Sequence, residues 1–149
     1  MSLAICTYSD SLKESLFGFY AECFPKIGKT FEPDGRHEFY NHIPTYFESF
    51  WCLTDDGAVL GSVAIHRFSD DTAELKALYL SEKLRGQGWG YKLMDTAIGF
   101  ARKEGYRRVV LDSMKSYTAA RRLYDKFGFK EIAAYNDNAF AEVFMELIL

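Results

Sequence analysis

Apolar residues in the first part of the chain recur every three or four positions, which is the spacing of one face of an α-helix. Those positions are Leu12, Leu16, Phe19 and Tyr20. They predict a helix over residues 10–23, preceded by a strand over 3–7 and followed by a loop over 25–35. A second, short helix is expected over 36–43 and is expected to end at Pro44, because proline cannot supply the backbone N–H that a continuing helix needs.

Beyond Pro44 the pattern changes to short apolar runs separated by turn-forming residues, which is typical of strands. The elements expected there are strands over 50–53, 59–65 and 72–80, a helix over 89–104, a strand over 107–111, a helix over 118–127, and strands over 129–134 and 140–148. An antiparallel meander therefore comes first, and strand–helix–strand units follow. This order predicts an α+β fold with a mixed α/β sheet, and the lack of a linker or repeat predicts a single domain over residues 1–149.

Composition excludes several classes of protein. Hydrophobic residues make up 48% of the 149 residues, with 13 Phe, 10 Tyr and 2 Trp, which is more than a disordered chain carries. The 18 basic and 21 acidic residues give a net charge of −3, with no basic cluster longer than a pair, so we expect no nucleic-acid partner. No apolar run approaches the roughly 18–20 residues of a membrane span, so we expect no membrane association and a cytoplasmic location.

Cysteine and histidine show neither a disulfide pattern nor a metal-binding pattern. The three cysteines, Cys6, Cys23 and Cys52, are odd in number and lie far apart in the sequence. The three histidines, His66 among them, lack the spacing of metal ligands and are expected on the surface or as hydrogen-bonded core residues. We therefore expect no bound metal.

The most informative segment is a glycine-rich loop between the third strand of the meander and the long helix. Glycine stands at every second position there: Gly86, Gly88 and Gly90. Such a loop leaves the first N–H groups of the helix open to an anion such as a pyrophosphate. A P-loop would need a following Gly-Lys pair, and a dinucleotide fingerprint would need G-x-G-x-x-G, so neither applies. A merely flexible turn is the remaining alternative.

Two motifs resemble those of the GNAT superfamily of N-acetyltransferases. Arg85-x-x-Gly88-x-Gly90, after Leu78-Tyr79-Leu80, is similar to the family's acetyl-coenzyme A signature. The segment Ala120–Phe129 is similar to its A-x-x-L-Y-x-x-x-G-F pattern. The resemblance covers roughly residues 74–130. It implies a three-layer fold and transfer of an acetyl group from acetyl-coenzyme A to a primary amine by direct attack.

The resemblance also assigns two catalytic roles. Tyr124 stands at the position of the family's general acid, which protonates the departing thiolate, and Glu74, eleven residues before Arg85, stands where the histone-type members keep their general base. Alternatives stay open for both. Tyr124 also fits an apolar helical stripe and could be a core aromatic, whereas a lone strand glutamate is often solvated and a water chain can act as the base.

Contacts with the cofactor are likewise implied by the resemblance. The residues expected to bind acetyl-coenzyme A are Leu78, Tyr79, Leu80, Arg85, Gly86, Gln87, Gly88, Trp89, Gly90, Tyr91, Ser113 and Tyr117. The backbone N–H of Leu78, or of a close neighbour, is the expected oxyanion donor. Tyr117 departs from the family, because many relatives carry Asn there, and either Ser113 or a water is expected to replace the lost polar contact.

Two further points stay open. A protein that binds coenzyme A without catalysis, as a sensor or partner domain, is the rival function, and an enzyme for a longer acyl group is a weaker one. The acceptor is expected to be an amine of a small molecule or a peptide, and homodimerisation is left open. Acidic and aromatic side chains in the terminal segments would suit a cationic amine or would simply be solvated: Phe31, Glu32, Asp34, Glu38, Tyr40, Tyr46, Phe47 and Asp137.

Overall fold

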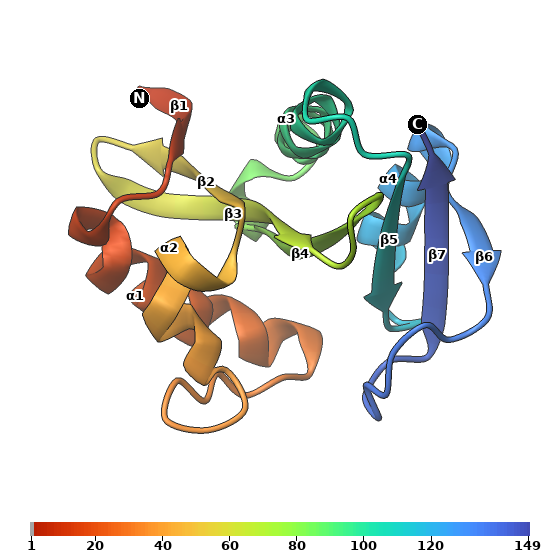
Figure 1. Cartoon of the computed structure of the whole chain (residues 1–149). Helices are drawn as coiled ribbons and strands as arrows, with labels where there is room; N and C mark the ends of the chain where they lie inside the picture. The colour runs from red at the N-terminus through yellow and green to blue at the C-terminus, as the bar shows by residue number, and fades with distance from the viewer. Residues whose placement is uncertain (1) are drawn as a thin grey trace.

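The computed structural model describes residues 2–149, which form one seven-stranded sheet of order β1-β2-β3-β4-β5-β7-β6 (Figure 1). The strands are β1 (Leu3–Thr7), β2 (Ser49–Asp55), β3 (Ala58–Arg67), β4 (Thr72–Leu80), β5 (Arg108–Ser113), β6 (Lys130–Ile132) and β7 (Val143–Ile148). The helices are α1 (Lys13–Cys23), α2 (Ile43–Tyr46), α3 (Trp89–Lys103) and α4 (Thr118–Phe127), with 3-10 turns over Asp10–Leu12, Phe24–Ile27, Glu38–His42 and Glu82–Leu84. The expected α+β architecture with a mixed sheet is confirmed.

Helices cover both faces of the sheet, which gives three layers. The apolar stripe of α3 is fully buried: Leu93, Met94, Ala97, Ile98 and Ala101. It shares one core with Tyr124 of α4. On the opposite face, Leu16 and Tyr20 of α1 pack in a second core with Phe50 of β2 and Ala77 of β4. Burying a Leu, Ile or Phe side chain contributes roughly 1.5–3 kcal/mol, so both cores stabilise the sheet between them.

The sheet opens between its two central strands. β4 and β5 run parallel but pair only over Thr72–Glu74 and Arg108–Val110, and beyond that point they separate (Figure 1). Ala77 has a left-handed φ of 58°, and the register between β3 and β4 shifts opposite it. This bulge bends β4 away from β5. The backbone of residues 75–80 on the β5 side therefore has no strand partner in the described part of the chain.

Pro44 does not end a helix, as the sequence pattern led us to expect. A 3-10 turn over Glu38–His42 comes first, and α2 then begins at Ile43 with Pro44 in its first turn. The N–H groups in the first turn of a helix have no acceptor within the helix, so proline, which lacks that N–H, is favoured there. The last strand also begins later than expected, at Val143, because side chains of two asparagines, Asn136 and Asn138, accept backbone hydrogen bonds and hold a turn.

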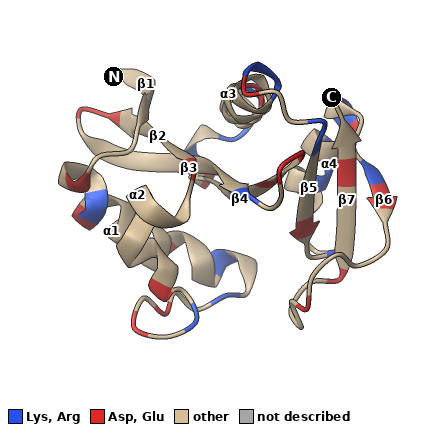
Figure 2. Ribbon diagram, in the orientation of Figure 1, with Lys and Arg blue, Asp and Glu red and all other residues tan. Residues whose placement is uncertain are grey.

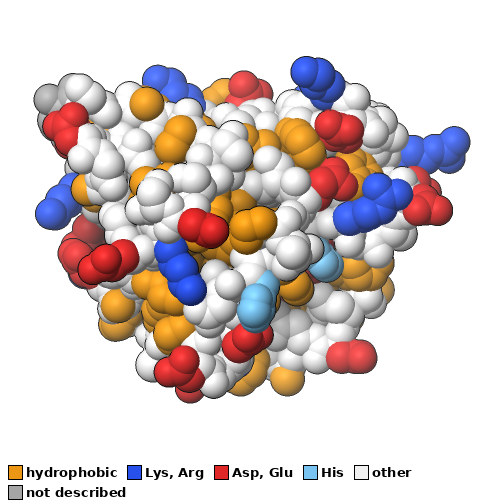
Figure 3. All heavy atoms as spheres, turned by 60° about the vertical axis from the view of Figure 1, so that its left-hand side comes forward, with side chains coloured by type: hydrophobic (Ala, Val, Ile, Leu, Met, Phe, Trp, Pro, Cys, Tyr) orange, Lys and Arg blue, Asp and Glu red, His pale blue; other side chains and the backbone are white. Residues whose placement is uncertain are grey.

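Charges of both signs are spread over the molecule. Short stretches of Lys and Arg and of Asp and Glu are scattered along the ribbon (Figure 2), and the face in Figure 3 carries no patch of one sign. Among residues 2–149 no helix is both long enough and apolar enough to cross a bilayer.

Candidate functional site

The glycine loop forms the N-terminal end of α3. Gly86 and Gly88 have left-handed φ values of 76° and 84°, and a Cβ atom on either would meet nothing within 4 Å. The first backbone bond into the helix runs from Lys92 N to the Gly88 carbonyl, so the amides of residues 89–91 have no helical partner. Open N–H groups at the positive end of a 15-residue helix form a site for an anion.

Gly90, unlike the other two glycines, matters for the packing of α3 against α4. A Cβ atom there would lie 2.9 Å from Leu123 Cδ1, so Gly90 allows α3 to pack closely against α4. Arg85 is exposed and, together with Lys26, lines a groove of about 270 Å³ between α1 and the end of β4. The structure thus brings the predicted pyrophosphate residues together with the end of β4.

Tyr124 of α4 and Ser113 of β5 lie close together. The Tyr124 side chain is 5% exposed, and burial raises the pKa of its phenol well above the ordinary value. Ser113 Oγ is buried and has no hydrogen-bond partner in the described chain. A buried polar atom without a partner is costly, so it indicates a place where a bound molecule completes the hydrogen bonding.

Glu74 is held by neighbours from three segments. Its carboxylate accepts hydrogen bonds from His66 Nδ1 at 3.0 Å and from the Tyr135 hydroxyl at 2.7 Å, and Lys76 Nζ lies 3.9 Å away. Burial alone would raise the pKa of Glu74, but these three partners outweigh it and lower the pKa. Glu74 therefore remains a carboxylate at neutral pH. His66 was expected on the surface or hydrogen-bonded, and it is hydrogen-bonded, with its ring stacked on Tyr46 at 4.6 Å.

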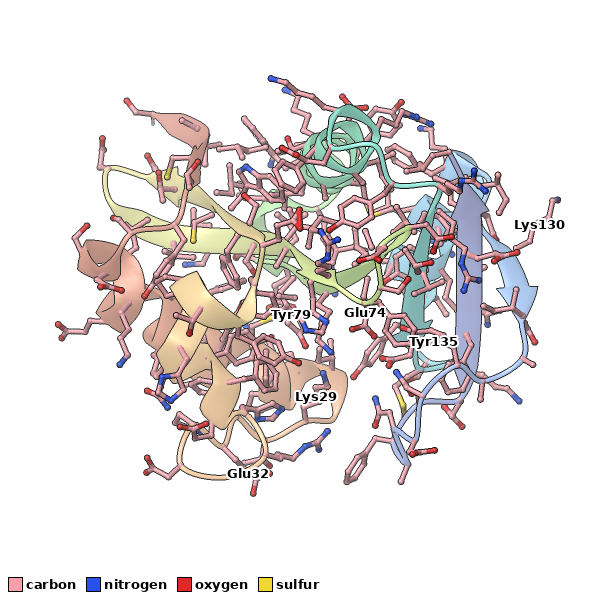
Figure 4. All side chains as sticks on the ribbon, in the orientation of Figure 1. Lys29, Glu32, Glu74, Tyr79, Lys130 and Tyr135 are labelled. Atoms are coloured by element: carbon pink, nitrogen blue, oxygen red, sulfur yellow. The ribbon has the colours of Figure 1, made fainter. Side chains whose placement is uncertain are left out.

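Two charged residues that the sequence did not single out face the same region. Lys29 Nζ donates to the Tyr79 hydroxyl at 2.7 Å, and burial lowers the pKa of Lys29 to about 8. Asp112 of β5 accepts a hydrogen bond from Asn136 Nδ2 at 2.8 Å. In Figure 4, Lys29 and Tyr79 approach from the α1 side, and Glu74 and Tyr135 lie where β4 meets β5. A polar residue near the end of the apolar strand β5 was the one available signal for Asp112, and no sequence signal marked Lys29.

Among the side chains considered for a cationic acceptor, the aromatic ones cluster around one core and the acidic ones do not join them. Tyr40 and Phe47 are buried in the core beneath α1. Glu38 pairs with His42 at 2.7 Å on the surface. Glu32, Asp34 and Asp137 are exposed, so the solvated alternative describes them.

Residues 2–149 contain no group of three or more His, Cys, Asp or Glu side chains placed to hold a metal ion. A further cavity of about 420 Å³ lies away from the motif residues, and its lining is Glu48, Arg67, Asp70, Phe100, Glu104 and Tyr106. The open edge of β4, the N-terminus of α3, Tyr124 and Glu74 therefore make up the candidate site.

Comparison with known proteins gives one consistent family. Residues 13–129 match the model of the acetyltransferase (GNAT) family. An uncharacterised N-acetyltransferase of Schizosaccharomyces pombe is 37% identical over 90 residues, which cover 60% of this chain and 55% of that protein. The probable N-acetyltransferase camello of Xenopus tropicalis is 28% identical over 131 residues, 87% of this chain and 60% of that protein. The chain thus spans little more than half the length of these relatives.

Solved structures share the fold. An acetyltransferase of Streptococcus agalactiae superposes with a TM-score of 0.87 at 23% identity, covering 99% of this chain and 98% of that one. A GNAT family acetyltransferase of Elizabethkingia anophelis, solved with acetyl-CoA bound, gives a TM-score of 0.72 at 17% identity, covering 99% and 98%. With the family match over residues 13–129, the chain belongs to the GNAT acetyltransferase family.

Proposed function

We propose that this protein transfers the acetyl group of acetyl-coenzyme A to a primary amine by direct attack. The observation that carries the proposal is the opening of the sheet between β4 and β5, which begins just beyond Glu74. It offers an unpaired strand edge, with the N-terminus of α3 beyond the end of β4 and the Tyr124 phenol among its neighbours.

Each part of acetyl-coenzyme A would meet a matching feature of this site. The amides of its pantetheine arm resemble a peptide and would pair with the free edge of residues 78–80 as an added strand. Its pyrophosphate would accept hydrogen bonds from the amides at the start of α3, beside Gly86, Gly88 and Arg85. Ser113 Oγ, which lacks a partner, would contribute a polar contact near the thioester, on the side where Tyr117 replaces the family's usual asparagine.

The chemistry needs one proton acceptor and one proton donor. The amine nitrogen attacks the thioester carbon, and the Leu78 N–H stabilises the negative charge that develops on the carbonyl oxygen. The Glu74 carboxylate takes the proton that the amine loses. The carbon–sulfur bond then breaks, and the Tyr124 hydroxyl protonates the departing thiolate. The products are an N-acetylated amine and free coenzyme A.

Thiol release from acetyl-coenzyme A in the presence of a panel of amines tests this function. We expect amine-dependent release with one acetylated amine, identified by mass spectrometry, for each thiol. The rival function, a protein that binds coenzyme A without catalysis, predicts tight binding in calorimetry and no release with any amine. Absence of both binding and release would contradict the proposed function and its rival alike.

A further inference from the structure

Lys29 is a half-buried cation without an acidic partner. Its Nζ atom lies 5.1, 5.2 and 5.8 Å from the ring centroids of Phe24, Tyr79 and Tyr117. Its one side-chain hydrogen bond goes to the Tyr79 hydroxyl, which leaves two ammonium protons without a partner. No carboxylate of residues 2–149 lies within 4 Å of it. An ammonium group withdrawn from water in this way is costly unless an anion accompanies it.

A second cation lies in the same loop. The Arg36 guanidinium also has no carboxylate within 4 Å, and it stacks 3.8 Å over the ring of Phe140 in the loop before β7. Its positive charge acts on Lys29, where it lowers the lysine pKa further. Lys76 also repels Lys29, but it already has Glu74 at 3.9 Å. Lys29 and Arg36 therefore keep unpaired donors, although the exposed carboxylates of Glu32 and Asp34 lie between them in the sequence.

Negative charge lies on the other side of the same region. Glu74 on β4 and Asp112 on β5 are carboxylates of the sheet, and Asp112 is the acidic group among the strongest influences on the pKa of Lys29. Glu74 and Asp112 thus belong to the sheet, whereas Lys29, which has no carboxylate within 4 Å, belongs to the loop after α1 (Figure 4 labels Glu74 and Lys29). A molecule with an amine at one end and a carboxylate at the other would complement both sides.

We infer that the acceptor is an amino acid, whose carboxylate is bound by Lys29 with Arg36 while its amine faces Glu74. This inference rests on the proposed function and names its substrate class. It makes Lys29 a specificity-determining residue, because it acts on the acceptor's carboxylate and takes no proton in the transfer.

The test compares common α-amino acids with their α-carboxamides, which keep the amine and lose the negative charge. For the wild type we expect the acid to be preferred in kcat/KM. Lys29→Met should reduce that preference about ten- to a hundredfold, as expected for loss of a charged hydrogen bond, mainly through the KM of the acid. Lys29→Arg should restore part of it. The matched control is Lys13→Met, because Lys13 also lies over an aromatic ring, at 5.4 Å from Phe17, but on α1.

Calorimetry with the same ligands on the coenzyme A complex separates this inference from the proposed function. Absence of turnover with every amine would count against the proposed function, and amino-acid binding would still report on Lys29. An unchanged preference in Lys29→Met overturns the inference, and so does an equal loss for acids and carboxamides, which a purely structural lysine would give. A tenfold loss of coenzyme A affinity in Lys29→Met also overturns it, because the anion would then be a phosphate of the cofactor.

Discussion

The pKa values of Tyr124 and Glu74 are shifted in opposite directions because the surroundings of the two side chains differ. The Tyr124 phenol is buried in an apolar core, which favours its neutral form and raises its pKa. The Glu74 carboxylate is buried as well, but donors from His66 and Tyr135 and the charge of Lys76 favour its ionised form and lower its pKa. At neutral pH the phenol therefore stays protonated and the carboxylate stays ionised, which are the states that the proposed proton donor and acceptor require.

Tyr124→Phe should lower turnover while acetyl-coenzyme A affinity stays nearly unchanged. The ring still fills its place in the core, and only the proton donor is lost. General-acid catalysis contributes about 10²–10⁴-fold, and we expect the lower end because a thiolate is already a fair leaving group. The loss should shrink as pH rises past the thiol pKa, near 8.5 by analogy with cysteine. Turnover measured against pH, with a calorimetric titration of each protein, checks this.

Tyr106→Phe is the matched control for this change. Tyr106 is 6% exposed in the same core, and its hydroxyl donates to Glu48, away from the candidate site. It should lose stability without the pH-dependent loss of turnover. If both variants lose activity in proportion to their thermal stability at every pH, Tyr124 is a structural residue.

At the scale of elements, the N-terminus of α3 carries the proposed pyrophosphate site, and a glycine pair at its two ends allows a controlled test. Gly88 and Gly105 have φ values of 84° and 86°, and a Cβ atom on either meets nothing within 4 Å. Alanine at such a position costs roughly 1–2 kcal/mol in backbone strain. Gly88→Ala should raise the Kd for acetyl-coenzyme A at least tenfold, because its Cβ occupies the anion site.

Gly105→Ala should lose similar stability and keep the parent Kd, because Gly105 follows the opposite end of α3. Calorimetry and thermal melts of the two variants make the comparison. Equal affinities of Gly88→Ala and Gly105→Ala for acetyl-coenzyme A would show that the glycine loop does not bind the cofactor. The bulkier Gly88→Val is less informative, since the left-handed φ strains a β-branched residue whether or not ligand is present.

The features that could be predicted from the sequence are those formed by residues close together along the chain. The loop, helix and strand around Gly88 follow from neighbouring residues, and so does α4 with its Gly128 end. Lys29, by contrast, meets Tyr79 across 50 positions, and Tyr135 meets Glu74 across 61. Those contacts depend on strand register and loop path, for which no local pattern exists. The bulge at Ala77 could not be predicted either, because an alanine at positive φ has no sequence signature.

At the scale of the molecule, the residues proposed to bind the donor and those proposed to bind the acceptor come from different segments around the opening between β4 and β5. The glycine loop, residues 78–80 of β4 and α4 supply the residues proposed for the donor, and the loop after α1 supplies Lys29 and Arg36, which are proposed for the acceptor. The two strands part just beyond Glu74. We therefore place acetyl-coenzyme A in this opening.

Amide hydrogen exchange with and without coenzyme A tests that claim most directly. We predict slower exchange in residues 75–80, whose edge toward β5 has no strand partner, and in residues 86–92 at the start of α3. The segments that line the cavity of about 420 Å³ around Glu48 and Tyr106 should exchange as before. Protection confined to that cavity, or no protection of residues 75–92 at saturating coenzyme A, would contradict the placement of the donor between β4 and β5.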